Sequence, residues 1–440
     1  MHNKRTILIL FIVILVVRLS LAAVIAGDEE AAMSNDSYGY LSLADNLVYH
    51  GQYFIDDGTN IDYFRTPGYP FFLALIFWIF GRHLWLVALI QLGLSSLTAW
   101  LLYLIGRRWL SPTIGLLAGL VLALLPNTAA WSLLVLSETL FTLLMVSGLY
   151  FLLKYIDDPR ASAAALVGLL LGCAIMVRPI GIILAAVWGT LMVLVSFNRS
   201  TLGMRIKGTF VFLVVLAAML LPWMFRNASV WGSFSLSNVS QWNLGYYIAP
   251  AVIAEQEGID REEARDWVEV SLNPTAEETA AHLDLVLSHP AAAAKVWLRS
   301  MADTLFGYGR TNLNAFWGRP YDIGAAFKLW QQSRWGDWIR SLSEPGQLGA
   351  LIIMMILLGT PTMILFLAAA GGVAAWRAGG RPKNVAILCL LSMLALLLPV
   401  IGVGNARFRV PLDPLLVLMG AWGLAKLVEK RFQGKKEISS

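Results

Sequence analysis

The sequence predicts an all-α polytopic membrane protein with about 10 to 12 transmembrane helices. Hydrophobic residues make up 58% of the 440 residues, charged residues make up 14%, and the mean hydropathy is +0.67. A soluble protein carries about 25% charged residues. Apolar runs recur from Thr6 onward, and a helix needs roughly 20 apolar residues to cross a hydrocarbon core of ~30 Å. Because the runs are continuous rather than alternating, they indicate helices and not the strands of a barrel.

Basic residues fix the expected orientation of these spans. Lys4 and Arg5 precede the first apolar run, which covers 6–26, and the cytoplasmic flanks of spans carry an excess of Lys and Arg. That run is longer than the roughly 7 to 15 residues of a signal-peptide core, so we expect an uncleaved first span. Later basic clusters alternate consistently with this orientation. The sequence therefore predicts cytoplasmic N- and C-termini, and its compact loops and lack of an organelle retention signal favour a bacterial inner (plasma) membrane.

Two longer polar segments divide the predicted spans, and both are expected outside the cytoplasm. The expected parts are an N-terminal transmembrane module at 1–229 with its first external loop at 27–82, a small, mostly helical external domain at 230–346, C-terminal transmembrane helices at 347–432, and a cytoplasmic tail at 433–440. Apolar residues at helical spacing predict helices over Ser37–Tyr49, Glu255–Val270 and Ala280–Leu305. The apolar stretch Pro67–Phe80 is too short to cross, so we expect the first loop to re-enter or to lie against the membrane surface there.

Composition also argues against several classes of function. The net charge of +5 comes from Lys and Arg beside span ends, as orientation requires, so no nucleic-acid partner is predicted. Cys173 and Cys389 both fall inside apolar runs, which argues against a structural disulfide. The histidines are scattered and no glycine-rich phosphate loop is visible, which argues against a histidine-based metal site and an ATP-driven pump.

Charged residues gather at what this topology predicts to be the outer boundary of the membrane. A charge at the centre of a span costs roughly 2.5–3.5 kcal/mol, so such residues are functional candidates. They come from six places in the chain: Asp36, Arg65, Glu138, Arg178, Arg226, Arg407 and Arg409. Arginine suits phosphate because its planar fork offers paired donors and stays charged. A carboxylate beside such a cluster can take a proton from an attacking hydroxyl group. We therefore expect one shared site.

Each of these residues also fits a structural role. Asp36 suits the cap of the helix expected from Ser37. Glu138 suits the cap of its own span or a pair with Arg178. An arginine at the end of a span commonly reaches toward lipid headgroups, so each arginine has this alternative as well.

The motifs around these residues resemble the GT-C superfamily of polytopic glycosyltransferases, in the branch of the protein O-mannosyltransferases and the aminoarabinose transferase of lipid A. The segments that carry the resemblance lie in the first 230 residues or so: Asp36–Tyr40, Leu43–Leu47, Gly51–Tyr53, Arg65–Pro70, Ser137–Phe141, Arg178–Pro179 and Pro222–Asn227. The Trp-Trp-Asp motif of the oligosaccharyltransferases is not found, which argues against that branch.

The resemblance implies an inverting transfer of a sugar from a polyprenyl-phosphate donor, such as an undecaprenyl phosphate, to an acceptor hydroxyl outside the cytoplasm. It implies that Asp36 is the general base and Glu138 the second acidic residue. The implied ligands of the donor phosphate are Arg65, Arg178, Arg226, Arg407 and Arg409, and the expected pocket residues are Tyr38, Tyr63 and Tyr69. No metal ligand is assigned, although Asp36 and Glu138 would share a divalent cation, Mg or Mn, if one is used. The expected partners are the lipid-linked donor, a glycan, lipid or protein acceptor, and the bilayer.

Two other functions compete with this one. A secondary transporter or flippase of an anionic lipid-linked substrate would use charges near the membrane midplane, where Arg18 lies. A non-catalytic lipid-binding subunit would tolerate the loss of Asp36. Replacement of Asp36 by asparagine distinguishes the enzyme from both, since only the enzyme should lose turnover.

Overall fold

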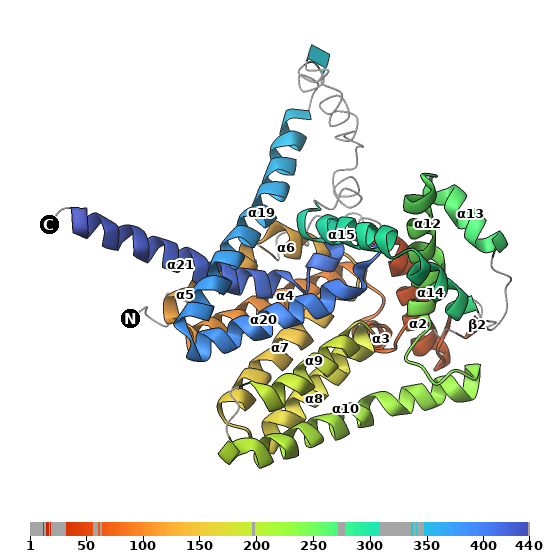
Figure 1. Ribbon diagram of the computed structural model, residues 1–440. Helices are drawn as coiled ribbons and strands as arrows, with labels where there is room; N and C mark the ends of the chain where they lie inside the picture. The colour runs from red at the N-terminus through yellow and green to blue at the C-terminus, as the bar shows by residue number, and fades with distance from the viewer. Residues whose placement is uncertain are drawn as a thin grey trace.

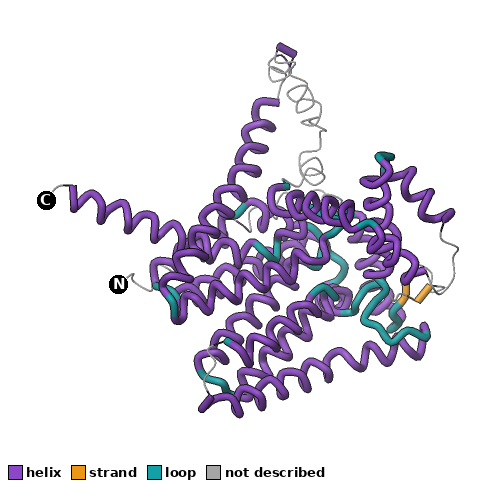
Figure 2. The backbone as a smooth tube through the Cα atoms, in the orientation of Figure 1, coloured by secondary structure: helices purple, strands orange, loops and turns teal. Residues whose placement is uncertain are grey.

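The computed structural model describes residues 32–55, 60–61, 64–195, 199–271, 278–307 and 347–438, together with residues 12, 15–16, 18, 336–337 and 340. This part of the chain is almost entirely helical, as Figure 1 and Figure 2 show. The exception is an antiparallel ribbon of two short strands, β1 (Phe54–Ile55) and β2 (Asn60–Ile61). The predicted all-α polytopic membrane fold is confirmed.

Long apolar helices form the body of the molecule. Within the described residues, five helices are long and apolar enough to cross a membrane, or six if one bent pair counts as a span. The five are α4 (Leu84–Trp109), α7 (Glu138–Asp157), α10 (Leu202–Trp231), α19 (Gln347–Ala378) and α20 (Gly380–Leu397). Packed with them are the bent pair α5 (Pro112–Leu124) and α6 (Pro126–Leu133), the shorter α8 (Ala161–Val177) and α9 (Gly181–Leu194), and α21 (Asp413–Ile438). The first predicted span, 6–26, lies outside the described residues except at positions 12, 15, 16 and 18.

Glycines let these helices approach one another closely. A Cβ atom at Gly115 of α5 would meet the backbone of Arg107 on α4, and one at Gly423 of α21 would meet the backbone of Leu367 on α19. Because lipid provides no hydrophobic drive for helix association, small residues that permit such contacts are common between membrane helices.

The bend of 48° between α5 and α6 provides hydrogen-bond partners for the buried Arg18. Pro126 has no N–H group, so it begins α6 and cannot donate a helical hydrogen bond to the Leu122 carbonyl near the end of α5. The Arg18 guanidinium donates to the carbonyl oxygens of Leu122, at 2.9 Å, and Ala123, at 2.6 Å, and to two hydroxyl groups. Arg18 thereby fastens the N-terminal segment to the bend.

Shorter helices gather at one end of the bundle (Figure 1). They are α2 (Asn35–His50), α3 (Gly68–Phe80), α11 (Val239–Asn243), the π-helical turn η3 (Leu244–Ile248), α12 (Ala249–Glu257), α13 (Arg261–Ser271), α14 (Glu278–Ser288) and α15 (Pro290–Phe306). Three turns of 3₁₀ helix complete the described elements: η2 (Arg199–Thr201), η4 (Leu398–Val400) and η5 (Ala406–Arg409). Helices α12–α15 share a small apolar core of their own.

Two helices expected from the sequence are each divided in the structure. The helix expected over Glu255–Val270 is interrupted because Gly258, with a φ of +71°, ends α12 before α13 begins. The helix expected over Ala280–Leu305 is interrupted at His289, since Pro290 cannot donate to the preceding turn and instead begins α15. The helix expected over Ser37–Tyr49 is confirmed as α2, and the stretch Pro67–Phe80 forms α3.

Candidate functional site

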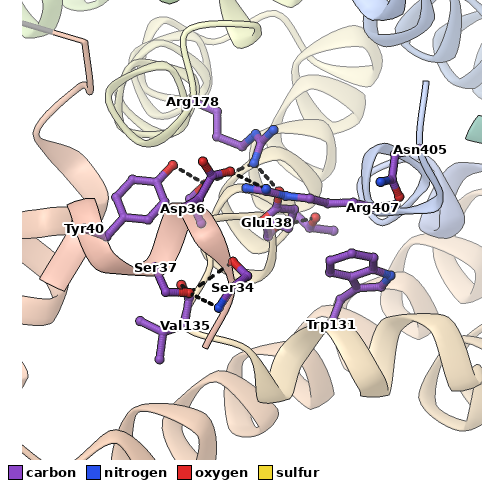
Figure 3. A network of polar contacts seen from close by, with 12 residues as sticks. Ser34, Asp36, Ser37, Tyr40, Trp131, Val135, Glu138, Arg178, Asn405 and Arg407 are labelled. Atoms are coloured by element: carbon purple, nitrogen blue, oxygen red, sulfur yellow. Dashed lines mark hydrogen bonds and ion pairs between the residues drawn. The ribbon is translucent and has the colours of Figure 1, made fainter. Parts of the chain in front are cut away.

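Asp36 lies in the first turn of α2, at the end of the bundle where the short helices gather. Ser34, not Asp36, is the N-cap of α2, which corrects the alternative that Asp36 caps this helix. Ser37 accepts a hydrogen bond from the Ser34 amide at 2.9 Å and donates to the Val135 carbonyl at 2.9 Å, so it anchors the helix to the segment before α7. The Asp36 carboxylate is therefore left to interact with groups outside its own helix (Figure 3).

Arg407 connects two carboxylates that come from different helices. Its Nη1 donates to Asp36 on α2, and its Nε donates to Glu138 at the start of α7. Figure 3 shows the three side chains pointing toward one another. The Arg407 amide in turn donates to the Asn405 side chain at 3.1 Å, which caps η5 and holds the arginine in position.

Glu138 is the buried carboxylate of this cluster. Its side chain is 1% exposed, and its Oε1 atom accepts from both Arg178 and Arg407. Arg178 also donates to the Ser137 hydroxyl at 3.1 Å. The Oε2 atom of Glu138 is buried and accepts no hydrogen bond within the part of the chain that is described. A carboxylate removed from water needs such charged partners, so Glu138 organises the two arginines around it.

Arg65 contacts the other carboxylate oxygen of Asp36, at a longer distance. Its Nη2 atom lies 3.8 Å from Asp36 Oδ1, and its guanidinium lies over the rings of Tyr40, at 5.0 Å, and Phe64, at 5.4 Å. Gly39 on α2 makes room for it, because a Cβ atom there would lie 2.5 Å from the Arg65 Cζ atom. Asp36 is thus held between Arg65 and Arg407.

Asp36 is the accessible carboxylate of the cluster, with 45% of its side chain exposed. Burial alone would raise the pKa of Asp36, but the guanidinium of Arg407, and after it those of Arg65 and Arg178, outweigh burial and hold this pKa below its usual value. Burial would lower the pKa of Arg407, but Glu138 and Asp36 raise it, so this arginine stays charged. An ionised, reachable carboxylate beside fixed positive charges can accept a proton, and the charges can bind an anion.

Part of the chain matches a known protein family, and its fold is similar to that of solved enzymes. Residues 65–225 match the sequence model of the dolichyl-phosphate-mannose-protein mannosyltransferase family. The archaeal oligosaccharyltransferase of Archaeoglobus fulgidus, solved with an inhibitory peptide and a dolichol-phosphate, is similar with a TM-score of 0.52 at 15% identity, over 97% of this chain and 52% of that one. An Archaeoglobus fulgidus oligosaccharyltransferase tethered to an acceptor peptide is similar with a TM-score of 0.54 at 15% identity, over 97% of this chain and 50% of that one. The chain has a GT-C fold.

The GT-C fold confirms the resemblance inferred from the motifs in the first part of the chain. The chain spans about half the length of the solved structures that it matches, and at 15% identity the likeness is one of fold. This likeness therefore does not assign the chain to the oligosaccharyltransferase branch, because the sequence lacks the Trp-Trp-Asp motif of that branch. No curated protein sequence matches the chain.

Arg409 does not have the environment expected of a phosphate ligand. Its side chain is 3% exposed, and it donates to the carbonyl oxygens of Leu305, at 2.8 Å, and Gly307, at 2.9 Å. It also pairs with Asp413 at 3.5 Å. These bonds tie η5 to the end of α15, so Arg409 supports the loop that carries Arg407 instead of facing a ligand.

Arg226 lies to one side of the cluster. It donates to the Asn227 side chain at 2.9 Å and to the Tyr53 carbonyl at 3.5 Å, and its guanidinium lies 4.7 Å from the centre of the Trp223 ring. Tyr53 donates to the Arg65 carbonyl at 3.0 Å. Arg226 is thus linked to the site through the segment that carries Arg65, and its expected role in phosphate binding stays a prediction.

The three expected pocket tyrosines have different environments. Tyr38 is exposed on α2. Tyr69 is fully buried, donates to Gln91 at 2.8 Å and packs edge-on against Tyr40 at 4.9 Å, and its expected role in the substrate pocket stays a prediction. Tyr63 lies outside the described residues.

Tyr40 and Phe408 belong to the site but were missed from the sequence. The Tyr40 hydroxyl lies 3.2 Å from the Ser137 hydroxyl, and the Arg178 guanidinium lies 5.7 Å from the centre of the Phe408 ring. Tyr40 was detectable, because residues four apart share a helix face and Tyr40 follows Asp36 by four. Phe408 carried no such signal.

The donor set does not suit a divalent cation. In the described chain, no group of three or more His, Cys, Asp or Glu side chains gathers as metal ligands. Asp36 and Glu138 both accept from Arg407, and Arg65 and Arg178 flank them. Three guanidinium groups around two carboxylates would repel a cation, so no chemical step is assigned to Mg or Mn here.

Proposed function

We propose that this protein is an inverting glycosyltransferase that moves a sugar from a polyprenyl-phosphate donor to an acceptor hydroxyl at the non-cytoplasmic face of a bacterial inner membrane. The observation that carries the proposal is the half-exposed Asp36 carboxylate, held between Arg65 and Arg407 at one end of a GT-C bundle. The donor would be an undecaprenyl-phosphate sugar in such a membrane, and both chain termini would be cytoplasmic.

Asp36 would act as the general base. Its carboxylate takes the proton of the acceptor hydroxyl while the acceptor oxygen forms a bond to the anomeric carbon of the sugar. The bond between that carbon and the phosphate oxygen breaks, and its electron pair leaves with the lipid phosphate. Attack opposite the leaving group inverts the anomeric configuration. The phosphate goes from one negative charge to two, and this added charge is what the enzyme must stabilise.

Arg65, Arg178 and Arg407 would stabilise the departing phosphate. These arginines are already oriented by Asp36, Glu138 and Ser137, so their charge is available without reorganisation as the negative charge grows. The loss of one such fixed donor typically lowers the rate by about 10²- to 10³-fold. Because Glu138 is buried and shared by two arginines, its proposed role is to position them.

The lipid tail of the donor would lie against α3. This helix begins three residues after Arg65, and it exposes a row of large apolar side chains at Phe71, Leu75 and Trp78. Such a surface is stable in a hydrocarbon environment and costly in water. A phosphate at Arg65 and a tail along α3 would place the donor at the edge of the bilayer, as a lipid-linked substrate requires.

The test is release of the lipid phosphate from a panel of radiolabelled polyprenyl-phosphate sugars by the purified full chain in lipid nanodiscs. We expect turnover with at least one donor, and we expect Asp36→Asn to lower it by about 10²- to 10⁴-fold while donor binding persists. Asp45→Asn is the matched control, because Asp45 lies on the same helix and pairs with Arg82 at 3.1 Å. Release by Asp36→Asn at the wild-type rate, or translocation of the intact donor without release, would overturn the proposal.

A further inference from the structure

Four aromatic rings form a continuous series beside the candidate site. Phe64 packs against Trp242 at 6.1 Å, Trp242 stacks on Tyr246 at 5.0 Å, and Tyr246 packs edge-on against Tyr247 at 4.8 Å. Phe64 precedes α3, and the other three rings come from α11 and η3. These four residues are called the aromatic platform below.

The platform is open on the surface although its residues are strongly apolar. Trp242 is 49% exposed and Tyr247 is 39% exposed. Large aromatic side chains contribute most when buried, so a connected set left open indicates a surface for an interaction. The backbone conformation also supports a functional surface here. η3 is a π-helical turn, a rare conformation that is found frequently at functional sites.

The platform adjoins the candidate site from two directions. The Arg65 guanidinium lies 5.4 Å from the Phe64 ring and 3.8 Å from Asp36. Burial and the neighbouring Tyr246 raise the pKa of Tyr247, and the charge of Asp36 contributes to the same rise. η3 also packs against the loop that precedes Arg407, since a Cβ atom at Gly402 would be 3.0 Å from the Tyr247 carbonyl oxygen.

We propose that the aromatic platform binds a pyranose ring of a carbohydrate acceptor and presents its hydroxyl group to Asp36. This inference rests on the proposed function and narrows its acceptor from a glycan, lipid or protein to a glycan. A pyranose has one face of C–H groups, which carry partial positive charge and pack against the negative face of an aromatic ring. Its hydroxyl groups lie around the edge of the ring and need polar partners.

The surroundings of the platform supply such polar partners. The Arg265 guanidinium lies 4.0 Å from the centre of the Tyr246 ring. The phenol groups of Tyr246 and Tyr247 are further hydrogen-bonding groups. The terminal N–H groups of the Arg265 guanidinium can donate to sugar hydroxyl groups, whereas a hydrocarbon chain offers them no acceptor. Apolar rings with a few polar groups at the edge are typical of a site that orients a small polar ligand.

The first measurement is binding, which needs no donor. Saturation-transfer NMR on the full chain in nanodiscs, with methyl α- and β-pyranosides of glucose, galactose and mannose, should give signal from the C–H face of at least one glycoside. Trp242→Ala and Tyr247→Ala should lose that signal. Trp267→Ala is the matched control, because Trp267 is similarly exposed on α13 at 45% and should keep it. Asp36→Asn should also keep it.

The second measurement is steady-state kinetics. Trp242→Ala should raise the KM for a glycan acceptor by roughly tenfold or more and leave the KM for the donor unchanged, since stacking contributes to acceptor binding alone. Glycoside signal that is absent, or equal in Trp242→Ala and wild type, would overturn the inference while donor turnover keeps the proposed function intact. Platform-dependent glycoside binding without turnover of any donor would refute the proposed function and leave the site standing. A lower unfolding temperature of Trp242→Ala in nanodiscs, with an unchanged glycoside signal, would identify the platform as a membrane-interface belt and overturn the inference.

Discussion

The guanidinium of Arg407 donates a hydrogen bond to the carboxylate of Asp36, 371 positions earlier in the chain. The proposed base is therefore partly covered by a group that the proposed donor phosphate also attracts. A phosphate bound beside Arg407 would share its positive charge with Asp36, so the Asp36 carboxylate would be less stabilised as an anion and would become a better proton acceptor. Donor binding would thus precede activation of the base, and the acceptor would be deprotonated only when the sugar is in position.

Replacement of Arg407 by glutamine should move the acid limb of kcat/KM to higher pH. Burial raises the pKa of Asp36 and Arg407 outweighs it, so removal of Arg407 leaves the burial effect in place and the pKa rises. The pH profile of lipid-phosphate release measures this shift. Arg82→Gln, which removes the partner of Asp45 on the same helix, should leave the limb in place. An acid limb at the wild-type pH in Arg407→Gln would contradict the assignment of Asp36 as the base.

The same pair should make the fold sensitive to acid. The folded-state pKa of Asp36 is lowered, so the stability that its ionised form contributes is present above the unfolded pKa and is lost as pH falls through the lowered folded value. Thermal unfolding in nanodiscs, measured across acidic pH, should show this loss in the wild type and a smaller slope in Asp36→Asn. Equal slopes in both proteins would count against the pairing.

Glu138→Gln should destabilise the protein strongly. It leaves Arg178 and Arg407 in a buried setting without their shared carboxylate, and loss of one partner from a buried ion pair costs about 3–5 kcal/mol. The unfolding temperature reports this loss. Glu429→Gln removes the exposed partner of Lys426, where the expected cost is about 0–1 kcal/mol, and serves as the control. A similar small effect at both positions would be inconsistent with a positioning role for Glu138.

Gly39→Ala should lower donor turnover with little loss of stability. Its methyl group would collide with the Arg65 guanidinium, which lies at the far end of a flexible side chain and can shift relative to Asp36. Alanine favours a helix more than glycine does, so α2 itself should tolerate the change. Gly93→Ala on α4 is the matched control, because its Cβ atom would have no neighbour within 4 Å. Turnover by Gly39→Ala equal to that of Gly93→Ala would argue against a role for the Arg65 position.

Arg409→Lys should affect stability, whereas Arg178→Lys should affect the kinetics of the donor. Lysine cannot reproduce two bonds to carbonyl groups and an ion pair from one planar fork, so Arg409→Lys should lower stability while the donor KM of the folded fraction is kept. Arg178→Lys should raise the donor KM or lower kcat. Unfolding curves and donor titrations on the same preparations separate the two effects. If Arg409→Lys raised the donor KM without lowering stability, Arg409 would again be assigned as a ligand of the donor phosphate.

The sequence was sufficient to predict the class of fold. It was also sufficient to predict that one end of the bundle holds Asp36, Glu138, Arg178 and Arg407. Apolar length and charge alternation are strong signals, and they place residues at span ends whichever way the helices pack. The partners of each arginine were not predictable. Arg407 and Arg409 are two residues apart in a 3₁₀ turn with three residues per turn, so their side chains point in different directions, one to the site and one to α15.

Local boundaries were missed where one residue decided them. Pro290 and Gly258 each divided a segment whose apolar spacing suggested one helix, since spacing does not register a missing N–H group or a left-handed backbone. The cap at Ser34 was missed because Asp36 has an equally good side chain for capping, and only the packing of Ser37 on Val135 fixes which residue begins the helix.

The hydrogen bonds of Arg18 also bear on how the chain is assembled in the membrane. Its acceptors at Leu122 and Ala123 are synthesised more than a hundred residues after it, and they become available only once Pro126 has interrupted the helix. Until then the guanidinium of the newly made N-terminal segment lacks these carbonyl acceptors, and hydrocarbon disfavours a charged group without them. Stable entry of that segment should wait for the bent pair to arrive, so a substitution that straightens the bend would be felt first during biosynthesis, as retention at the insertion machinery or early degradation.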